Sequence, residues 1–124
     1  MHRILIIDDE PALRLTIRET LEAAGYEVEE AQNGAEGLSL HRRWPFHLII
    51  TDIFMPGKDG LEVIKELRQG SEFVPVLAIS GGGLFHAEEA LTAARNVGAS
   101  EVLQKPFALK QILWSVESAL QTPC

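Results

Sequence analysis

The sequence is poor in cysteine, in basic residues and in long apolar runs. Its one cysteine, Cys124, is the last of 124 residues, so no internal disulfide can form and a structural zinc site is not expected. Only 11 Lys and Arg residues stand against 18 Asp and Glu, which argues against binding to the phosphates of nucleic acid or to anionic lipid. No apolar run is as long as a membrane span, and the N-terminal residues do not resemble a signal peptide. These absences predict a cytoplasmic protein that binds neither nucleic acid nor membranes.

What is present is the composition of one globular domain. Hydrophobic residues make up 46% and charged residues 23%, which excludes a disordered or collagen-like chain. A chain of this length supports one hydrophobic core, so we interpret residues 1–124 as a single domain, with residues 121–124 as a frayed tail or the start of a linker. The net charge of -7 leaves open whether the acidic residues are scattered for solubility or gathered in a site.

Short apolar runs alternate with segments of helical periodicity. The runs predict strands at residues 4–7, 26–28, 46–50, 74–79 and 102–103. The periodic segments predict helices at residues 11–24, 33–42, 60–69, 85–97 and 108–120. The alternation indicates parallel strands joined by right-handed crossovers. The predicted fold class is therefore α/β, a doubly wound five-stranded parallel sheet with helices on both faces.

The helical segments also predict which side chains face the sheet. Steps of three and four residues assign Ala24, Ala35 and Leu109 to inner faces, together with the larger apolar residues of the same helices. Trp44 and Trp114 are interpreted as packing residues.

Residue types suited to phosphoryl chemistry follow four of the predicted strands. They are Asp8 and Asp9 after the first strand, Asp52 after the third, Ser80 after the fourth and Lys105 after the fifth. Because these strands are neighbours in this topology, the side chains are expected to converge at one edge of the sheet. Taken singly, the acidic pair fits a helix cap and Asp52 fits a turn. The combination is better explained by one site for a phosphoryl group.

The residue types define the chemistry of such a site. Three carboxylates at one edge repel one another unless a cation joins them, and Mg²⁺ is the expected cation because it prefers oxygen ligands. Asp52 is the predicted nucleophile, which would hold the phosphoryl group as an acyl phosphate. Lys105 and the Ser80 hydroxyl would contact the phosphoryl oxygens.

These motifs resemble the receiver domain of bacterial two-component response regulators, over essentially the whole chain. The matching segments are residues 4–10 (ILIIDDE), 52–60 (DIFMPGKDG), 78–80 (AIS) and 98–107 (GASEVLQKPF). The resemblance implies a flavodoxin-like fold with the strand order 2-1-3-4-5. It also implies a stand-alone receiver similar to the chemotaxis regulators.

The resemblance implies roles for the acidic residues. Asp52 would take its phosphoryl group from a histidine kinase or a histidine phosphotransfer protein. Asp9, Asp52 and the backbone carbonyl of Phe54 would bind Mg²⁺ directly, and Asp8 would act through water.

Further residues concern how phosphorylation would be transmitted from the site to the rest of the domain. By resemblance, Ser80 would move toward the phosphoryl group, Lys105 would be its cationic partner, and Pro106 is a candidate for a cis peptide bond. Val102 stands where the family usually has Tyr or Phe. The coupled movement of a hydroxyl and an aromatic ring that is usual in the family is therefore not expected in this chain. Gly81 stands where Ala is frequent, and the three glycines at residues 81–83 are expected to loosen the loop.

The resulting prediction is a signalling switch rather than an enzyme. It would catalyse only its own phosphorylation and dephosphorylation, and the phosphorylated state would alter binding to a downstream effector protein, as a monomer or a phosphorylation-dependent dimer. The alternative is a receiver-like interaction module in which phosphorylation is dispensable, or whose output is atypical because of Val102. An aspartyl phosphatase would need a second Asp where the chain has Phe54. A flavin carrier would need a phosphate loop where the chain has three acidic residues.

Overall fold

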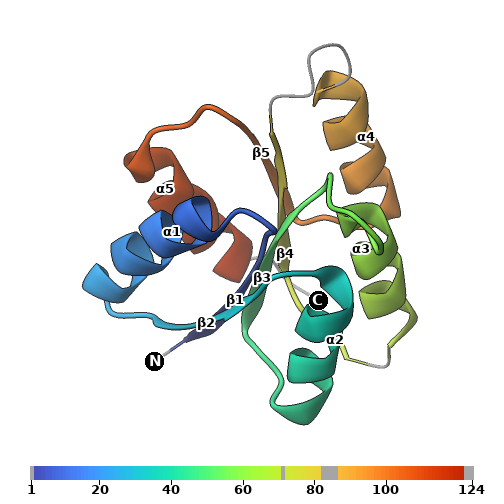
Figure 1. Ribbon diagram of the computed structural model, residues 1–124, viewed down its shortest axis with the longest axis horizontal. Coiled ribbons are helices and arrows are strands. Elements are labelled where there is room, and N and C mark those ends of the chain that lie inside the picture. The colour runs from blue at the N-terminus through green and yellow to red at the C-terminus, as the bar shows by residue number, and fades with distance from the viewer. Residues whose placement is uncertain (1, 71, 82–86, 122–124) are drawn as a thin grey trace.

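The computed structural model describes residues 2–70, 72–81 and 87–121, within which five strands and five helices alternate along the chain (Figure 1). The strands are β1 (Arg3–Ile7), β2 (Glu27–Ala31), β3 (Leu48–Asp52), β4 (Val76–Ser80) and β5 (Glu101–Gln104). The helices are α1 (Pro11–Ala23), α2 (Gly34–Arg43), α3 (Gly60–Gln69), α4 (Ala87–Val97) and α5 (Leu109–Leu120). None of the helices in the described ranges has the length and apolar character needed to cross a membrane.

The strands form one parallel sheet in the order β2-β1-β3-β4-β5, which confirms the predicted fold. The register places Asp52 beside Ile79, and Ser80 beside Gln104. The carboxyl ends of the four strands β1, β3, β4 and β5 therefore meet at one edge of the sheet.

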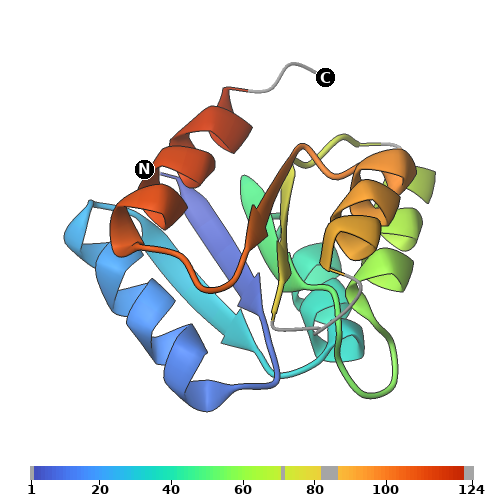
Figure 2. The ribbon, with the colours of Figure 1, turned by 90° about the horizontal axis from the view of Figure 1, so that it is seen from above.

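Helices cover both faces of the sheet, as the view from above shows (Figure 2). Alternate residues of β1 point into two separate cores. Leu5 and Ile7 pack on the side of α2, α3 and α4, whereas Ile4 and Ile6 pack on the side of α1 and α5. Because the central strands are apolar on both faces, as expected of a covered parallel sheet, they hold the carboxyl edge in a fixed position.

The strand boundaries differ from the apolar runs by one to three residues, and two central strands are shifted toward their carboxyl ends. β3 and β4 both begin two residues later than predicted and continue into the polar residues Asp52 and Ser80. Phe46 and Val74 are buried but precede these strands, because an apolar run indicates burial and not the hydrogen bonding of a sheet. β2 continues to Ala31 because an edge strand tolerates outward-facing polar side chains. The predicted start of the fourth helix at residues 85–86 lies outside the described residues.

Two helix-face predictions are wrong at alanines. Ala24 follows the last residue of α1 and is exposed, and Ala35 is exposed on α2. The surface of α2 that meets the sheet includes Gly37 instead, where a Cβ atom would lie 2.4 Å from Cδ1 of Ile7. The absence of a side chain at this position is what lets α2 approach β1 closely.

Three large side chains that were predicted to pack are exposed. Leu109 is 47% exposed, Trp44 is 59% exposed and Trp114 is 75% exposed. Leu109 is the first residue of α5 and Trp44 follows the last residue of α2, where helical periodicity no longer holds a side chain against the sheet.

Candidate functional site

The first part of the site is the turn after β1. Asp8 is 2% exposed, and its carboxylate accepts a hydrogen bond from the Glu10 N–H at 2.9 Å. Asp9 is exposed, and Glu10 stands at the N-cap of α1 without a side-chain capping bond. A helix cap therefore does not account for the acidic character of this turn.

The second part is Asp52, the last residue of β3. Its side chain is buried, and Oδ1 accepts a hydrogen bond from the Phe54 N–H at 3.4 Å. The chain then folds back, and the Gly60 N–H donates to the Ile53 carbonyl at 2.9 Å. A Cβ atom at Gly60 would lie 2.3 Å from the Asp52 carbonyl oxygen, so α3 can begin this close to the site only with glycine.

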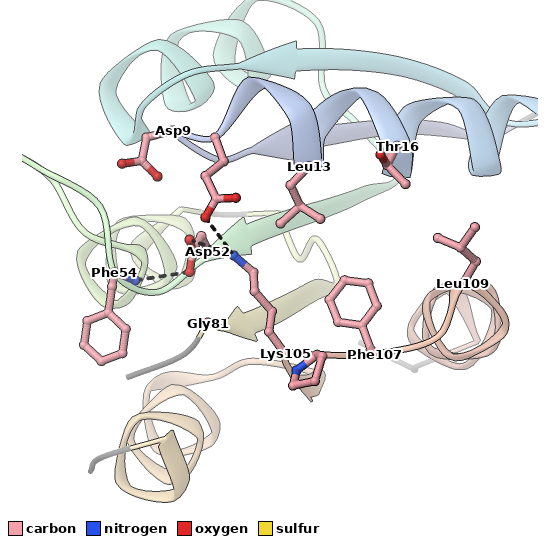
Figure 3. A pocket seen from close by; sticks show the side chains of 11 residues that line it. Asp9, Leu13, Thr16, Asp52, Phe54, Gly81, Lys105, Phe107 and Leu109 are labelled. Carbon is pink, nitrogen blue, oxygen red and sulfur yellow. Dashed lines mark hydrogen bonds and ion pairs between the residues drawn. The ribbon is translucent and has the colours of Figure 1, made fainter. Parts of the chain in front are cut away.

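The third part is Lys105, which follows β5 and points its ammonium group at the acidic residues (Figure 3). Its Nζ lies 3.4 Å from Asp52 Oδ2, 3.7 Å from Asp8 Oδ2 and 3.9 Å from Glu10 Oε1. The bond between Lys105 and Pro106 is cis, the isomer that the resemblance suggests. Lys105 is thus the counter-ion of carboxylates from two strand ends.

The fourth part is Ser80, the last residue of β4. Its carbonyl accepts the Lys105 N–H at 2.9 Å, and its side chain is fully buried. The Ser80 Oγ has no hydrogen-bond partner among the described residues. A buried hydroxyl of this kind is available to a ligand oxygen. Gly81 packs on Lys105, since a Cβ atom there would lie 2.8 Å from Nζ, whereas Gly82 and Gly83 lie outside the described residues.

The carboxylates of Asp8, Asp9 and Asp52 form a cluster, in which one oxygen of each lies within 4.8 Å of the others. The pKa of Asp8 is raised to about 6, chiefly by burial, with the negative charge of Asp52 adding to the effect. Burial also raises the pKa of Asp52, although the nearby Lys105 opposes this. Oxygen donors at this spacing fit Mg²⁺, because a divalent ion would neutralise the repulsion that burial makes costly.

Two further residues for which the sequence predicts a role are Phe54 and Val102. Phe54 is 49% exposed, and its ring points away from the Asp52 carboxylate (Figure 3). Val102 is half-buried and packs on the core beneath α4. The Phe54 carbonyl as a metal ligand, and the consequence of Val102 for signalling, stay predictions.

An open hollow of about 740 Å³ adjoins the acidic cluster. One end of it is lined by Asp52 and Lys105, and the other by the apolar side chains of Leu13, Phe107 and Leu109 (Figure 3). The sequence offered no signal for this apolar end, because Leu13 and Leu109 have the spacing of core residues. The acidic cluster is therefore accessible to solvent from between α1 and the segment that leads into α5.

Comparisons with known proteins match this arrangement. Residues 4–117 match the family model of the response regulator receiver domain. The response regulators MprA of Mycobacterium sp. (strain KMS) and Mycobacterium leprae (strain TN) are 35% and 34% identical over 119 residues, which are 96% of this chain and 50% and 51% of theirs. The chain thus spans about half the length of the curated relatives it matches.

Two solved structures are similar over nearly their whole length. The chemotaxis protein CheY4 of Vibrio cholerae has a TM-score of 0.85 at 32% identity, with 96% of this chain and 98% of that chain covered. The receiver domain of NtrX from Brucella abortus has a TM-score of 0.89 at 30% identity, with coverage of 97% and 99%. The strand order, the residues at the strand ends and the matched sequence all lead to one conclusion: the chain belongs to the family of response regulator receiver domains of two-component signal transduction.

Proposed function

We propose that this domain is a phosphoryl-accepting switch in which Asp52 is the phosphorylated residue. The observation that carries the proposal is the convergence of Asp52 with the carboxylates of Asp8 and Asp9, the Lys105 ammonium and the Ser80 hydroxyl at one edge of the sheet. The hollow beside them gives a phosphodonor access to Asp52.

The proposed reaction is a transfer from a phosphorylated histidine. A carboxylate oxygen of Asp52 attacks phosphorus, an acyl phosphate bond forms, and the bond from phosphorus to the imidazole nitrogen breaks. The electron pair stays on the imidazole, which takes up a proton. Lys105, already 3.4 Å from Asp52 Oδ2, compensates the charge of the phosphoryl oxygens. The Ser80 hydroxyl, which lacks a partner among the described residues, donates to one of these oxygens.

Asp9, Asp52 and the Phe54 carbonyl are the proposed direct ligands of Mg²⁺, and Asp8 is proposed to act through water. When bound, the ion supplies positive charge to the oxygens of the phosphoryl group. Its binding also offsets the repulsion among the three carboxylates, which lie within 4.8 Å of one another.

The proposed partners are a histidine kinase or histidine phosphotransfer protein as donor, and an effector protein that distinguishes the two states. The domain would act in the cytoplasm, as a monomer or as a dimer formed on phosphorylation. It would catalyse only its own phosphorylation and dephosphorylation.

The proposal is tested with acetyl phosphate, and with beryllofluoride as a stable mimic, each with and without Mg²⁺. We expect an increase in intact mass by one phosphoryl group, and NMR shifts of the amides of residues 52–54 and 80–81, both dependent on Mg²⁺. Asp52→Asn should abolish the mass increase because it removes the nucleophile. Asp59→Asn is the matched control, since Asp59 caps α3 and lies outside the acidic cluster. An unmodified wild-type protein would refute the proposal.

A second candidate function is an interaction module that works without phosphorylation. The observation that favours it is Val102, which has no aromatic ring that could move together with the Ser80 hydroxyl. The two functions differ in one result, because the second predicts partner binding that is the same in Asp52→Asn and in the wild type.

Phosphorylated Asp52 is expected to decay slowly, because Phe54 has no polar group that would orient a water molecule for attack. Phe54→Asn should therefore speed the loss of the phosphoryl group several-fold, measured by intact mass after removal of the donor. Trp44→Asn is the control, since it replaces another exposed aromatic residue after α2. Equal decay in Phe54→Asn and the wild type would contradict this expectation.

A further inference from the structure

The main chain of Asp8 is held at both of its polar groups. The Asp8 N–H donates to the Ala31 carbonyl at 3.1 Å, at the end of β2. The Asp8 carbonyl accepts a hydrogen bond from Nη1 of Arg14, which lies one turn into α1. Because the peptide unit is planar, holding this carbonyl also fixes the N–H of Asp9. The orientation of two acidic residues thus depends on one side chain of α1.

Arg14 is itself held in place by Glu30 on β2. Its Nε lies 2.9 Å from Glu30 Oε1, and the Arg14 side chain is only 14% exposed. Arg18, one turn further along α1, contacts the other oxygen of Glu30 at 3.0 Å and also pairs with Glu22. Both arginines therefore share one glutamate, but only Arg14 reaches the turn that carries the acidic cluster.

The positive charge of Arg14 is compensated by Glu30 and does not neutralise the carboxylates of the acidic cluster. Burial by itself would raise the pKa of Glu30, but the hydrogen bonds from Arg18 and Arg14 outweigh burial and hold that pKa below its ordinary value. The negative charge of Glu30 compensates the guanidinium of Arg14. Arg14 contacts a neutral carbonyl of Asp8, so it orients the turn without occupying a carboxylate oxygen.

We propose that Arg14 is a positioning residue for the Mg²⁺ and phosphorylation site, acting through its hydrogen bond to the Asp8 carbonyl. This inference rests on the proposed function. Groups that orient metal ligands commonly change metal affinity when they are removed, although they do not touch the ion. Glu30 completes the arrangement by fixing the guanidinium that makes the contact.

The test compares Arg14→Met with Arg18→Met. Each variant removes one arginine from Glu30, but only the first removes the bond to Asp8. We expect Arg14→Met to weaken Mg²⁺ binding about 10-fold in an NMR titration, and Arg18→Met to change it little. In the metal-free protein, the Asp9 amide resonance should shift in Arg14→Met and not in Arg18→Met.

The inference is overturned if Arg14→Met binds Mg²⁺ as the wild type does, or if both variants weaken binding equally. Should Arg14→Met not fold, as judged by urea unfolding, Arg14→Gln takes its place with the same expected result. A wild-type protein without a Mg²⁺ response would instead refute the proposed function, so the two failures are distinguishable.

Discussion

In metal-free protein, replacing Asp8 by Asn is expected to raise the free energy of unfolding by about 2 kcal/mol at about pH 8. The Asp8 carboxylate is 2% exposed, and its pKa rises from 3.8 to about 6 on folding, mainly because of burial. The charged form is therefore destabilised in the folded state. An amide keeps an oxygen that can accept the Glu10 N–H and carries no charge, although it loses the attraction of Lys105. Urea unfolding in the presence of a chelator measures the difference.

The pH dependence of this effect has a definite sign. Because the pKa of Asp8 is raised on folding, its protonation contributes stability that is fully present below pH 3.8 and lost as the pH rises through about 6. The advantage of Asp8→Asn should therefore shrink as the pH falls from about 8 to about 4.5. Asp9→Asn is the control, since it removes the same charge from an exposed neighbour. A difference that stays constant over this range would contradict the assignment of the cost to a buried charge.

Replacing Gly60 by Ala is expected to destabilise the fold by about 3 kcal/mol, at the upper end of the usual cost of adding a methyl group to a packed site. The added carbon would lie 2.3 Å from the Asp52 carbonyl oxygen and 2.7 Å from Cα of Ile53. Both are backbone atoms of the segment that ends β3, so no side-chain rotation relieves the contact. Thermal or urea unfolding gives the loss of stability, and the amide resonances of residues 52–54 should shift.

Gly70 is the matched control at the other end of α3. Among the described residues, a Cβ atom at Gly70 meets only the Leu67 carbonyl, at 3.3 Å, and the backbone φ of -73° is one that alanine adopts readily. Gly70→Ala should therefore change stability far less. Similar losses in the two variants would show that the close contact at Gly60 is relieved by movement of the chain.

The sequence predicts the arrangement of the site because topology alone decides it. Once strands and helices alternate, the carboxyl ends of β1, β3, β4 and β5 must share an edge. Asp8 and Lys105 directly follow two of these strands, and Asp52 is the last residue of a third. No side-chain detail is needed for that step, so the convergence is predictable from residue type and position.

The contacts that depend on how two elements pack are not predictable in this way. The hydrogen bond from Arg14 to the Asp8 carbonyl needs the angle at which α1 crosses β2, which a helical pattern does not specify. The same holds for Gly37, since periodicity counts a glycine as neutral although its lack of a side chain sets the distance between α2 and β1. Single large side chains such as Trp114 are also ambiguous, because an aromatic residue suits a core as well as a surface.

The absence of a side chain at Gly81 determines where the Lys105 side chain can lie. A Cβ atom at Gly81 would lie 2.8 Å from both Cδ and Nζ of the lysine, which belong to the far end of a flexible side chain. A side chain at residue 81 would therefore be accommodated by rotation of the lysine rather than by movement of the backbone. The glycine thus lets Lys105 extend past the end of β4 to Asp52 and Asp8, and Gly81→Ala would displace its ammonium group from these carboxylates.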